Sequence, residues 1–195
     1  MRTAHVSRQT SETQIDLKLT IDGTGTAELN TNIPFFDHML TLFAKHSLMD
    51  LTLTLKGDID IDYHHSVEDA GICLGKAFKE ALGDAKGITR YADVVLPMDE
   101  TLCQMAIDIS GRSYLAFDVP FQADKIGQFD TELVQEFFNA FVSHAGVTLH
   151  VKLLAGTNAH HVSEACFKAL AVVLLRATTI DPRKANQIPS TKGML

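Results

Sequence analysis

The chain has 195 residues, of which 46% are hydrophobic and 21% charged, the balance of an ordinary globular protein with a buried core. Its formal net charge of -7 argues against nucleic acid as a partner, but a small phosphorylated ligand is still compatible. No apolar run reaches membrane-spanning length and the N-terminus lacks a signal-peptide core, so we expect a cytoplasmic protein without membrane contact. Cys73, Cys103 and Cys166 lie in apolar periodic segments, which favours buried free thiols.

The first half of the chain predicts three strands, a helix, a strand and a helix. Alternation of polar and apolar residues predicts half-buried strands at 3–9, 13–21, 26–29 and 51–55. Apolar steps of three and four residues predict one amphipathic helix from Pro34 to about His46. The same spacing predicts a second helix from His64 to about Leu82, with Gly83 as its natural stop.

The same order then returns in the second half. It predicts strands at 90–96, 102–109 and 113–119, a polar loop, a helix at 131–144, a strand at 147–154 and a helix at 160–179. The strand that begins at Val147 matches the one that begins at Leu51, an offset of 96 positions, which indicates an internal duplication. We therefore predict an α+β fold of internally duplicated ββαβα-type halves, about 1–86 and 87–180, with a mostly antiparallel sheet packed under helices.

Two copies of one motif open the long apolar helices, His64-His-Ser-Val-Glu68 and His160-His-Val-Ser-Glu164. Residues three or four apart share a helix face, whereas adjacent histidines diverge by about 100°, so one helix hardly directs both at one ion. Two such helices facing each other would build two sites, each with groups from opposite copies. One copy alone would be weak evidence, because exposed helix starts often carry polar residues. The repetition predicts a duplicated dinuclear metal site, and its mixed ligands suit Mn²⁺, Fe²⁺ or Zn²⁺.

Further motifs, taken with these, identify a family. They are Phe36-Asp-His-Met-Leu, His64-His-x-x-Glu-Asp69, Gly111-Arg-x-Tyr-Leu, Thr148-Leu-His, Gly156-x-Asn-x-His-His161 with Glu164, Phe167-Lys-Ala, and Pro189-Ser-Thr-Lys-Gly193. In order and spacing, the whole chain resembles the imidazoleglycerol-phosphate dehydratases. The resemblance implies a hydro-lyase that converts imidazole glycerol phosphate to imidazole acetol phosphate and water in histidine biosynthesis. It also implies two Mn²⁺ per subunit, a fold related to domain 2 of ribosomal protein S5, and a large cubic homo-oligomer of trimers with 24 subunits.

The resemblance also implies the site residues. One metal would be held by His38, His64, His161 and Glu164, and the other by His65, Glu68, His160 and the residue at position Glu136. This chain departs from the family there, because many members have histidine at that position, although glutamate is also able to bind manganese. The implied substrate contacts are Glu12, His38, His46, Arg90, Arg112, Ser190 and Lys192. The residues alone slightly favour a structural role, with Arg90 and Arg112 as strand-edge charges and Glu12 as a turn carboxylate. The resemblance reverses this preference.

The reaction must remove a weakly acidic proton from a carbon with no carbonyl beside it. Metal ions on the substrate imidazole would stabilise an imidazolate-like form, and loss of hydroxide would give a diazafulvene-type intermediate. We expect Glu12 to move the proton, with Glu164 and His46 as alternatives. The serine and lysine of the C-terminal tail would hold the phosphate with Arg90 and Arg112. Three other functions use parts of this pattern: a metal-storage assembly, an RNA-binding module and a metal-dependent phosphohydrolase.

Overall fold

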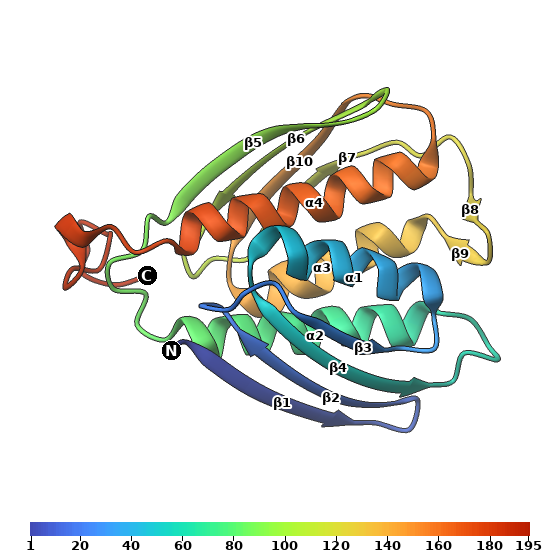
Figure 1. Ribbon diagram of the computed structural model, residues 1–195, viewed down its shortest axis with the longest axis horizontal. Coiled ribbons are helices and arrows are strands. Elements are labelled where there is room, and N and C mark those ends of the chain that lie inside the picture. The colour runs from blue at the N-terminus through green and yellow to red at the C-terminus, as the bar shows by residue number, and fades with distance from the viewer.

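Two four-stranded sheets form the outer layers of the molecule, and four helices fill the space between them (Figure 1). The computed structural model describes all 195 residues. Each half of the chain builds its own sheet, and the two halves share the order of three strands, a helix, a strand and a helix. The predicted α+β fold with a duplicated half is confirmed. None of the helices combines the length and apolar character that a membrane crossing requires.

The first sheet has the strand order β1-β2-β4-β3. Its strands are β1 (Thr3–Gln9), β2 (Thr13–Thr20), β3 (Ala27–Asn30) and β4 (Asp50–Gly57). The first three in this order are antiparallel, and β3 runs parallel to β4. Alternate residues of β2 are buried, as the polar and apolar pattern requires when one face packs on helices. The helices of this half are α1 (Pro34–Ser47) and α2 (His64–Leu82).

The second sheet repeats this arrangement with the order β5-β6-β10-β7. Its strands are β5 (Tyr91–Met98), β6 (Thr101–Asp108), β7 (Tyr114–Asp118) and β10 (Thr148–Ala155). The helices are α3 (Glu132–Ala145) and α4 (Ala159–Thr178). A short hairpin of β8 (Lys125–Ile126) and β9 (Phe129–Asp130) stands where the sequence predicts only a polar loop. A 3-10 turn, η1 (Pro182–Lys184), follows α4 in the tail.

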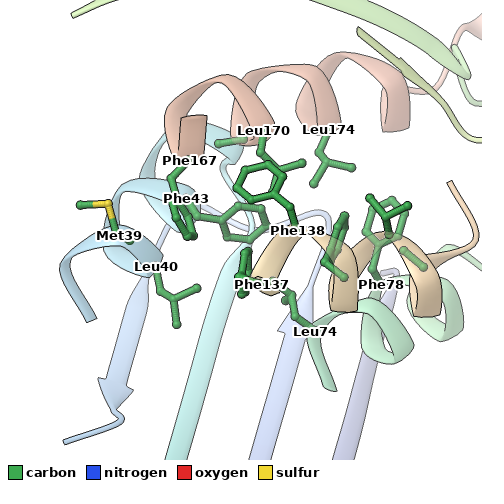
Figure 2. Close-up of a cluster of buried hydrophobic side chains, with 14 of the residues drawn as sticks. Met39, Leu40, Phe43, Leu74, Phe78, Phe137, Phe138, Phe167, Leu170 and Leu174 are labelled. Carbon is green, nitrogen blue, oxygen red and sulfur yellow. The ribbon is translucent and has the colours of Figure 1, made fainter. Parts of the chain in front are cut away.

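The helices pair across the two halves. Helix α1 packs against α4, and α2 packs against α3, so each pair takes one helix from each half. Figure 2 shows the phenylalanine side chains that meet between them, with the rings of Phe137 and Phe167 stacked at 5.0 Å between centroids. Full burial of one such side chain stabilises the fold by roughly 1.5–3 kcal/mol, so this shared core holds the halves together.

All four helices begin at the same end of the molecule, on the right in Figure 1, and run towards the chain termini. The two His-His motifs therefore lie at one end of the helical layer. The C-terminal tail leaves α4 at the other end, where the backbone N–H of Arg90 donates to the carbonyl of Ala177. Helix α4 has 20 residues, which corresponds to roughly 30 Å between these ends.

Candidate active site

A histidine from one half and a histidine-carboxylate pair from the other half meet where α1 and α4 begin. Nε2 of His38 lies 2.9 Å from Oε1 of Glu164, and Nε2 of His160 lies 3.1 Å from the same oxygen. One potential ligand atom from each of the three residues lies within 4.8 Å of the other two. The chain holds no second group of three histidine, cysteine or carboxylate side chains that meets this condition.

Local structure explains why these side chains converge. His160 and Glu164 are four residues apart on α4 and therefore share one face. The side chain of Asn158 caps that helix and accepts hydrogen bonds from the backbone N–H of His160 and His161, at 3.0 and 3.4 Å. On α1, Asp37 accepts from the backbone and the hydroxyl of Thr31, at 3.1 and 2.7 Å, and so fixes the start of the helix that carries His38.

The carboxylate of Glu164 is the centre of this group and is 7% exposed. Burial by itself raises the pKa of Glu164, but hydrogen bonds from Lys168, His38 and His160 outweigh burial and lower this pKa to about 2. Nζ of Lys168 lies 2.6 Å from Oε2 of Glu164. Two imidazole nitrogens and a carboxylate that is ionised at neutral pH form a donor set that fits Mn²⁺, Fe²⁺ or Zn²⁺ better than Mg²⁺ or Ca²⁺.

The second histidine of each pair points elsewhere. Nδ1 of His161 lies 2.7 Å from Oε2 of Glu100, and Nδ1 of His65 lies 2.9 Å from Oδ2 of Asp58. The hydrogen bond to Glu100 raises the pKa of His161, and the hydrogen bond to Asp58 raises the pKa of His65. Both rings are partly exposed. The structure therefore joins His160, not His161, to His38 and Glu164 within one chain, because adjacent helical residues diverge by about 100°.

Glu68, His64 and Glu136 lie where α2 and α3 begin. Glu136 is partly exposed and is the fifth residue of α3, as His38 is the fifth residue of α1. Helix α3 packs on α2 as α1 packs on α4. Glu136 therefore occupies the position next to the α2 motif that His38 occupies next to the α4 motif. These three side chains do not form a compact donor group within the single chain.

The predicted phosphate contacts lie at the far end of the helical layer. Arg90 is 9% exposed; its Nε donates to Oδ1 of Asp108 at 2.7 Å and its Nη1 to the carbonyl of Pro189 at 2.7 Å. Arg90 therefore fastens the tail just before Ser190. Arg112 is largely exposed, with Nη2 3.7 Å from Oδ2 of Asp108. Of the tail residues, Lys192 is exposed and Ser190 is partly exposed.

Of the two remaining predicted residues, Glu12 lies at the metal-ligand end, whereas His46 lies about two helical turns beyond His38 on α1. Glu12 is exposed in the β1–β2 turn, and its Oε1 lies 3.8 Å from Nε2 of His65. His46 lies in the last turn of α1. Loss of solvent lowers the pKa of His46, and the positive charge of Lys168 lowers it further, so the ring is neutral at physiological pH.

Three residues of this site were missed by the sequence reasoning. Lys168 follows Glu164 by four residues, a helical spacing that signals contact, and it stands in the Phe167-Lys-Ala motif. Glu100 precedes Thr101 in the β5–β6 turn as Glu12 precedes Thr13 in the β1–β2 turn, so the duplication could have found it. No signal in the sequence links Asp58 to His65, because the loop conformation brings them together.

Comparison with known proteins gives one consistent family. A sequence profile described as imidazoleglycerol-phosphate dehydratase matches residues 31–174. The chain is 57% identical to the imidazoleglycerol-phosphate dehydratase of a Methylorubrum extorquens strain over 100% of both chains. It is 58% identical to the protein of that name from Azorhizobium caulinodans, over 100% of this chain and 99% of the relative.

Solved structures of proteins with the same name share the fold. The imidazoleglycerol-phosphate dehydratase of Staphylococcus aureus is 40% identical, with a TM-score of 0.84 over 92% of this chain and 99% of that chain. The protein from Pyrococcus furiosus, in complex with (S)-C348, is 36% identical, with a TM-score of 0.83 over 97% and 100% of the two chains.

Proposed function

Since the chain belongs to the imidazoleglycerol-phosphate dehydratase family of hydro-lyases, we propose that its reaction depends on two manganese ions per subunit and passes through a diazafulvene-type form of the substrate ring. The substrate would be imidazole glycerol phosphate and the products imidazole acetol phosphate and water. The observation that carries the metal proposal is the convergence of His38, His160 and Glu164. Three buried free cysteines suit the reducing cytoplasm as its compartment.

We propose further that each active site is shared between subunits. Within one chain, the metal-ligand end and the tail end of the helical layer are separated by the length of α4, roughly 30 Å. A small phosphorylated imidazole cannot reach across that distance to touch both His38 and Lys192. The partly exposed rings of His65 and His161 are available to a neighbouring copy. A homo-oligomer of trimers with 24 subunits would bring the two ends of different chains together.

The metal ions would activate the substrate ring, and side chains of the protein would bind its phosphate. When bound, manganese lowers the pKa of the substrate imidazole N–H and makes the ring an electron sink. Arg112, Ser190 and Lys192 would hold the phosphate through charge-assisted hydrogen bonds, on a tail that Arg90 holds in place.

We assign the proton transfer to Glu12, whose carboxylate is exposed beside His65. Glu164 fits this role less well, because a carboxylate with a pKa of about 2 is a weak base and its oxygens already accept from three donors. His46 is neutral and remains the alternative base. A Glu12→Gln variant with normal manganese content and a rate about 10²–10⁴-fold lower would support Glu12. An unchanged rate in that variant would exclude Glu12 from this step.

Product formation tests the metal dependence directly. Protein stripped with a chelator and desalted should form no imidazole acetol phosphate, and added Mn²⁺ should restore the rate. A full rate in metal-free protein would refute the metal proposal. Manganese binding without any product would favour the metal-storage function instead.

Mixed oligomers test the shared site. His38→Ala lacks a metal ligand and Lys192→Ala lacks a phosphate contact, so each variant alone should be inactive or nearly so. Co-assembled in equal amounts, they should regain about a quarter of the parent activity, since a quarter of the subunit pairings combine an intact metal end with an intact tail. A mixture no more active than its components would place both groups of residues in one chain's site.

A further inference from the structure

Two carboxylates outside the expected ligand set hold the second histidine of each His-His pair. Oε2 of Glu100 lies 2.7 Å from Nδ1 of His161, and Oδ2 of Asp58 lies 2.9 Å from Nδ1 of His65. In both rings the nearest carboxylate oxygen to Nε2 is 3.8 Å away, beyond hydrogen-bond distance. Each ring therefore has one nitrogen engaged by a carboxylate and the other available to a ligand.

Glu100 is itself held rigidly. Its Oε1 accepts from the backbone N–H of Asn158 at 3.0 Å and of Thr157 at 3.4 Å, and from the hydroxyl of Thr101 at 3.2 Å. One oxygen thus ties the β5–β6 turn to the start of α4, while the other faces His161. The carboxylate cannot rotate away from the ring without breaking these bonds.

Asp58 is only half satisfied in its hydrogen bonding. Its Oδ1 is buried and has no hydrogen-bond partner, while its Oδ2 contacts His65. A buried carboxylate oxygen without a partner lowers the stability of the folded protein. Such a cost is tolerated where the group serves a function, and the only side chain that Asp58 contacts by a hydrogen bond is His65.

We propose that Glu100 and Asp58 are positioning residues that hold the proton of His161 and His65 on Nδ1, so that Nε2 is presented to a divalent metal ion. The inference rests on the proposed function, because it requires both histidines to be ligands. A carboxylate on Nδ1–H fixes the tautomer and the orientation of the ring and makes Nε2 a better donor. The need arises from helix geometry. The first histidine of each pair has a glutamate four residues on, but the residue four after His161 is alanine. Asp69, four residues after His65, is held by Arg8 and Thr13 instead.

Manganese binding to the variants Glu100→Gln and Asp58→Asn tests the proposal at pH 8, where protons compete little for the histidines. Each variant should bind manganese about 10–100-fold more weakly at one of the two sites and normally at the other. The amide oxygen introduced by Glu100→Gln can still accept the backbone bonds, so the Tm of the metal-free protein should not change. Binding is measured by titration of stripped protein and by manganese content after desalting.

A matched control is available on the first sheet. Oδ2 of Asp16 lies 2.8 Å from Nε2 of the exposed His5, a pair of the same kind that is no part of the proposed site. Asp16→Asn should bind manganese as the parent protein does. If it weakens binding as much as the test variants, the effect is one of general charge and the proposal is overturned.

The variants His161→Ala and His65→Ala distinguish the ligand role of the histidines from the positioning role of Glu100 and Asp58. If they keep two tightly bound manganese ions, the histidines are not ligands, and the proposed function fails at these positions together with this inference. If they lose manganese while Glu100→Gln and Asp58→Asn bind it as tightly as the parent, only the positioning role is overturned. Weaker binding that appears only with a lower Tm of the metal-free protein also overturns it, because the carboxylates would then act through folding alone.

Discussion

Glu136 is the residue of α3 that we predict to bind the second metal ion. It stands fifth in α3, as His38 stands fifth in α1, and a pair of buried phenylalanines follows it. If position 136 binds the second metal, Glu136→Ala should lose about one manganese per subunit and most activity, while Glu136→His keeps both, because imidazole is also a good manganese ligand. Manganese content by elemental analysis and the rate of product formation test this.

Glu132→Ala is the control for this residue, because Glu132 is an exposed carboxylate one helical turn earlier on the same helix. It should leave manganese content unchanged. Full manganese and full rate in Glu136→Ala would exclude position 136 from the coordination shell and leave the second ion to the histidines and Glu68.

At the scale of elements, the crossing of α2 over α3 depends on glycine. A Cβ at position 75 would lie 2.6 Å from the carbonyl oxygen of Phe141 and 2.9 Å from the backbone nitrogen of Ala145. Gly75→Ala should therefore destabilise the protein by about 1–3 kcal/mol through overpacking, although alanine favours an isolated helix by about 1 kcal/mol. Thermal unfolding at fixed protein concentration should show a Tm lower by about 2–4 °C per kcal/mol.

Lys76→Ala changes the neighbouring, exposed position of the same helix and provides the comparison. Its Tm should stay within about 2 °C of the parent. A Gly75→Ala protein as stable as the parent would mean that the two helices can move apart without loss, and that their close approach is not needed for stability.

Arg2, beside the N-terminus, forms an ion pair within the first half and a hydrogen bond to the end of α4 in the second half. Nε of Arg2 lies 3.1 Å from Oδ2 of Asp22, and Nη1 of Arg2 donates to the carbonyl of Thr178 at 2.8 Å. The hydrogen bonds from Arg2 lower the pKa of Asp22 below its ordinary value of 3.8. Because the folded-state pKa is depressed, the pair stabilises the protein above about pH 4, and this contribution disappears as pH falls through the folded-state pKa.

Asp22→Asn should accordingly lower stability near pH 7 by about 0.5–1 kcal/mol, since the carboxylate is partly exposed and screened. The difference from the parent should shrink below about pH 4, and also at high salt. Urea unfolding at both pH values measures it. A difference that grows on acidification would show that the sign of this linkage is wrong.

Metal binding and assembly of the oligomer should be linked. One chain brings together three donor side chains, and manganese usually takes about six ligands, so a neighbouring chain would complete each site. Removal of the metal should then shrink the oligomer, because the binding free energy contributes to association. Light scattering before and after chelation, and after Mn²⁺ is restored, tests this. An unchanged mass with empty sites would exclude metal ions at the interface.

The sequence by itself determined the elements of this protein and their duplication. Polar-apolar alternation and helical spacing depend only on which face of a segment is buried. A strand or helix can therefore be predicted from its own residues, without knowing which elements pack against it. The repeated His-His-x-x-Glu copies, 64–68 and 160–164, could therefore be placed at helix starts in advance. The small β8–β9 hairpin was missed because strands of two residues carry no period.

Only the tertiary structure decided which side chains meet. That α1 pairs with α4, and not with α2 of its own half, depends on contacts between residues more than a hundred positions apart, which no local pattern reports. This pairing brings His160 to His38. Packing of α4 on β5 and β6 brings His161 to Glu100, and the pairing of β5 with β6 places Arg90 beside Asp108 under the tail. The physical reason is that the sequence of a helix indicates which of its faces is apolar. The element that packs on that face is decided by the packing of the whole core.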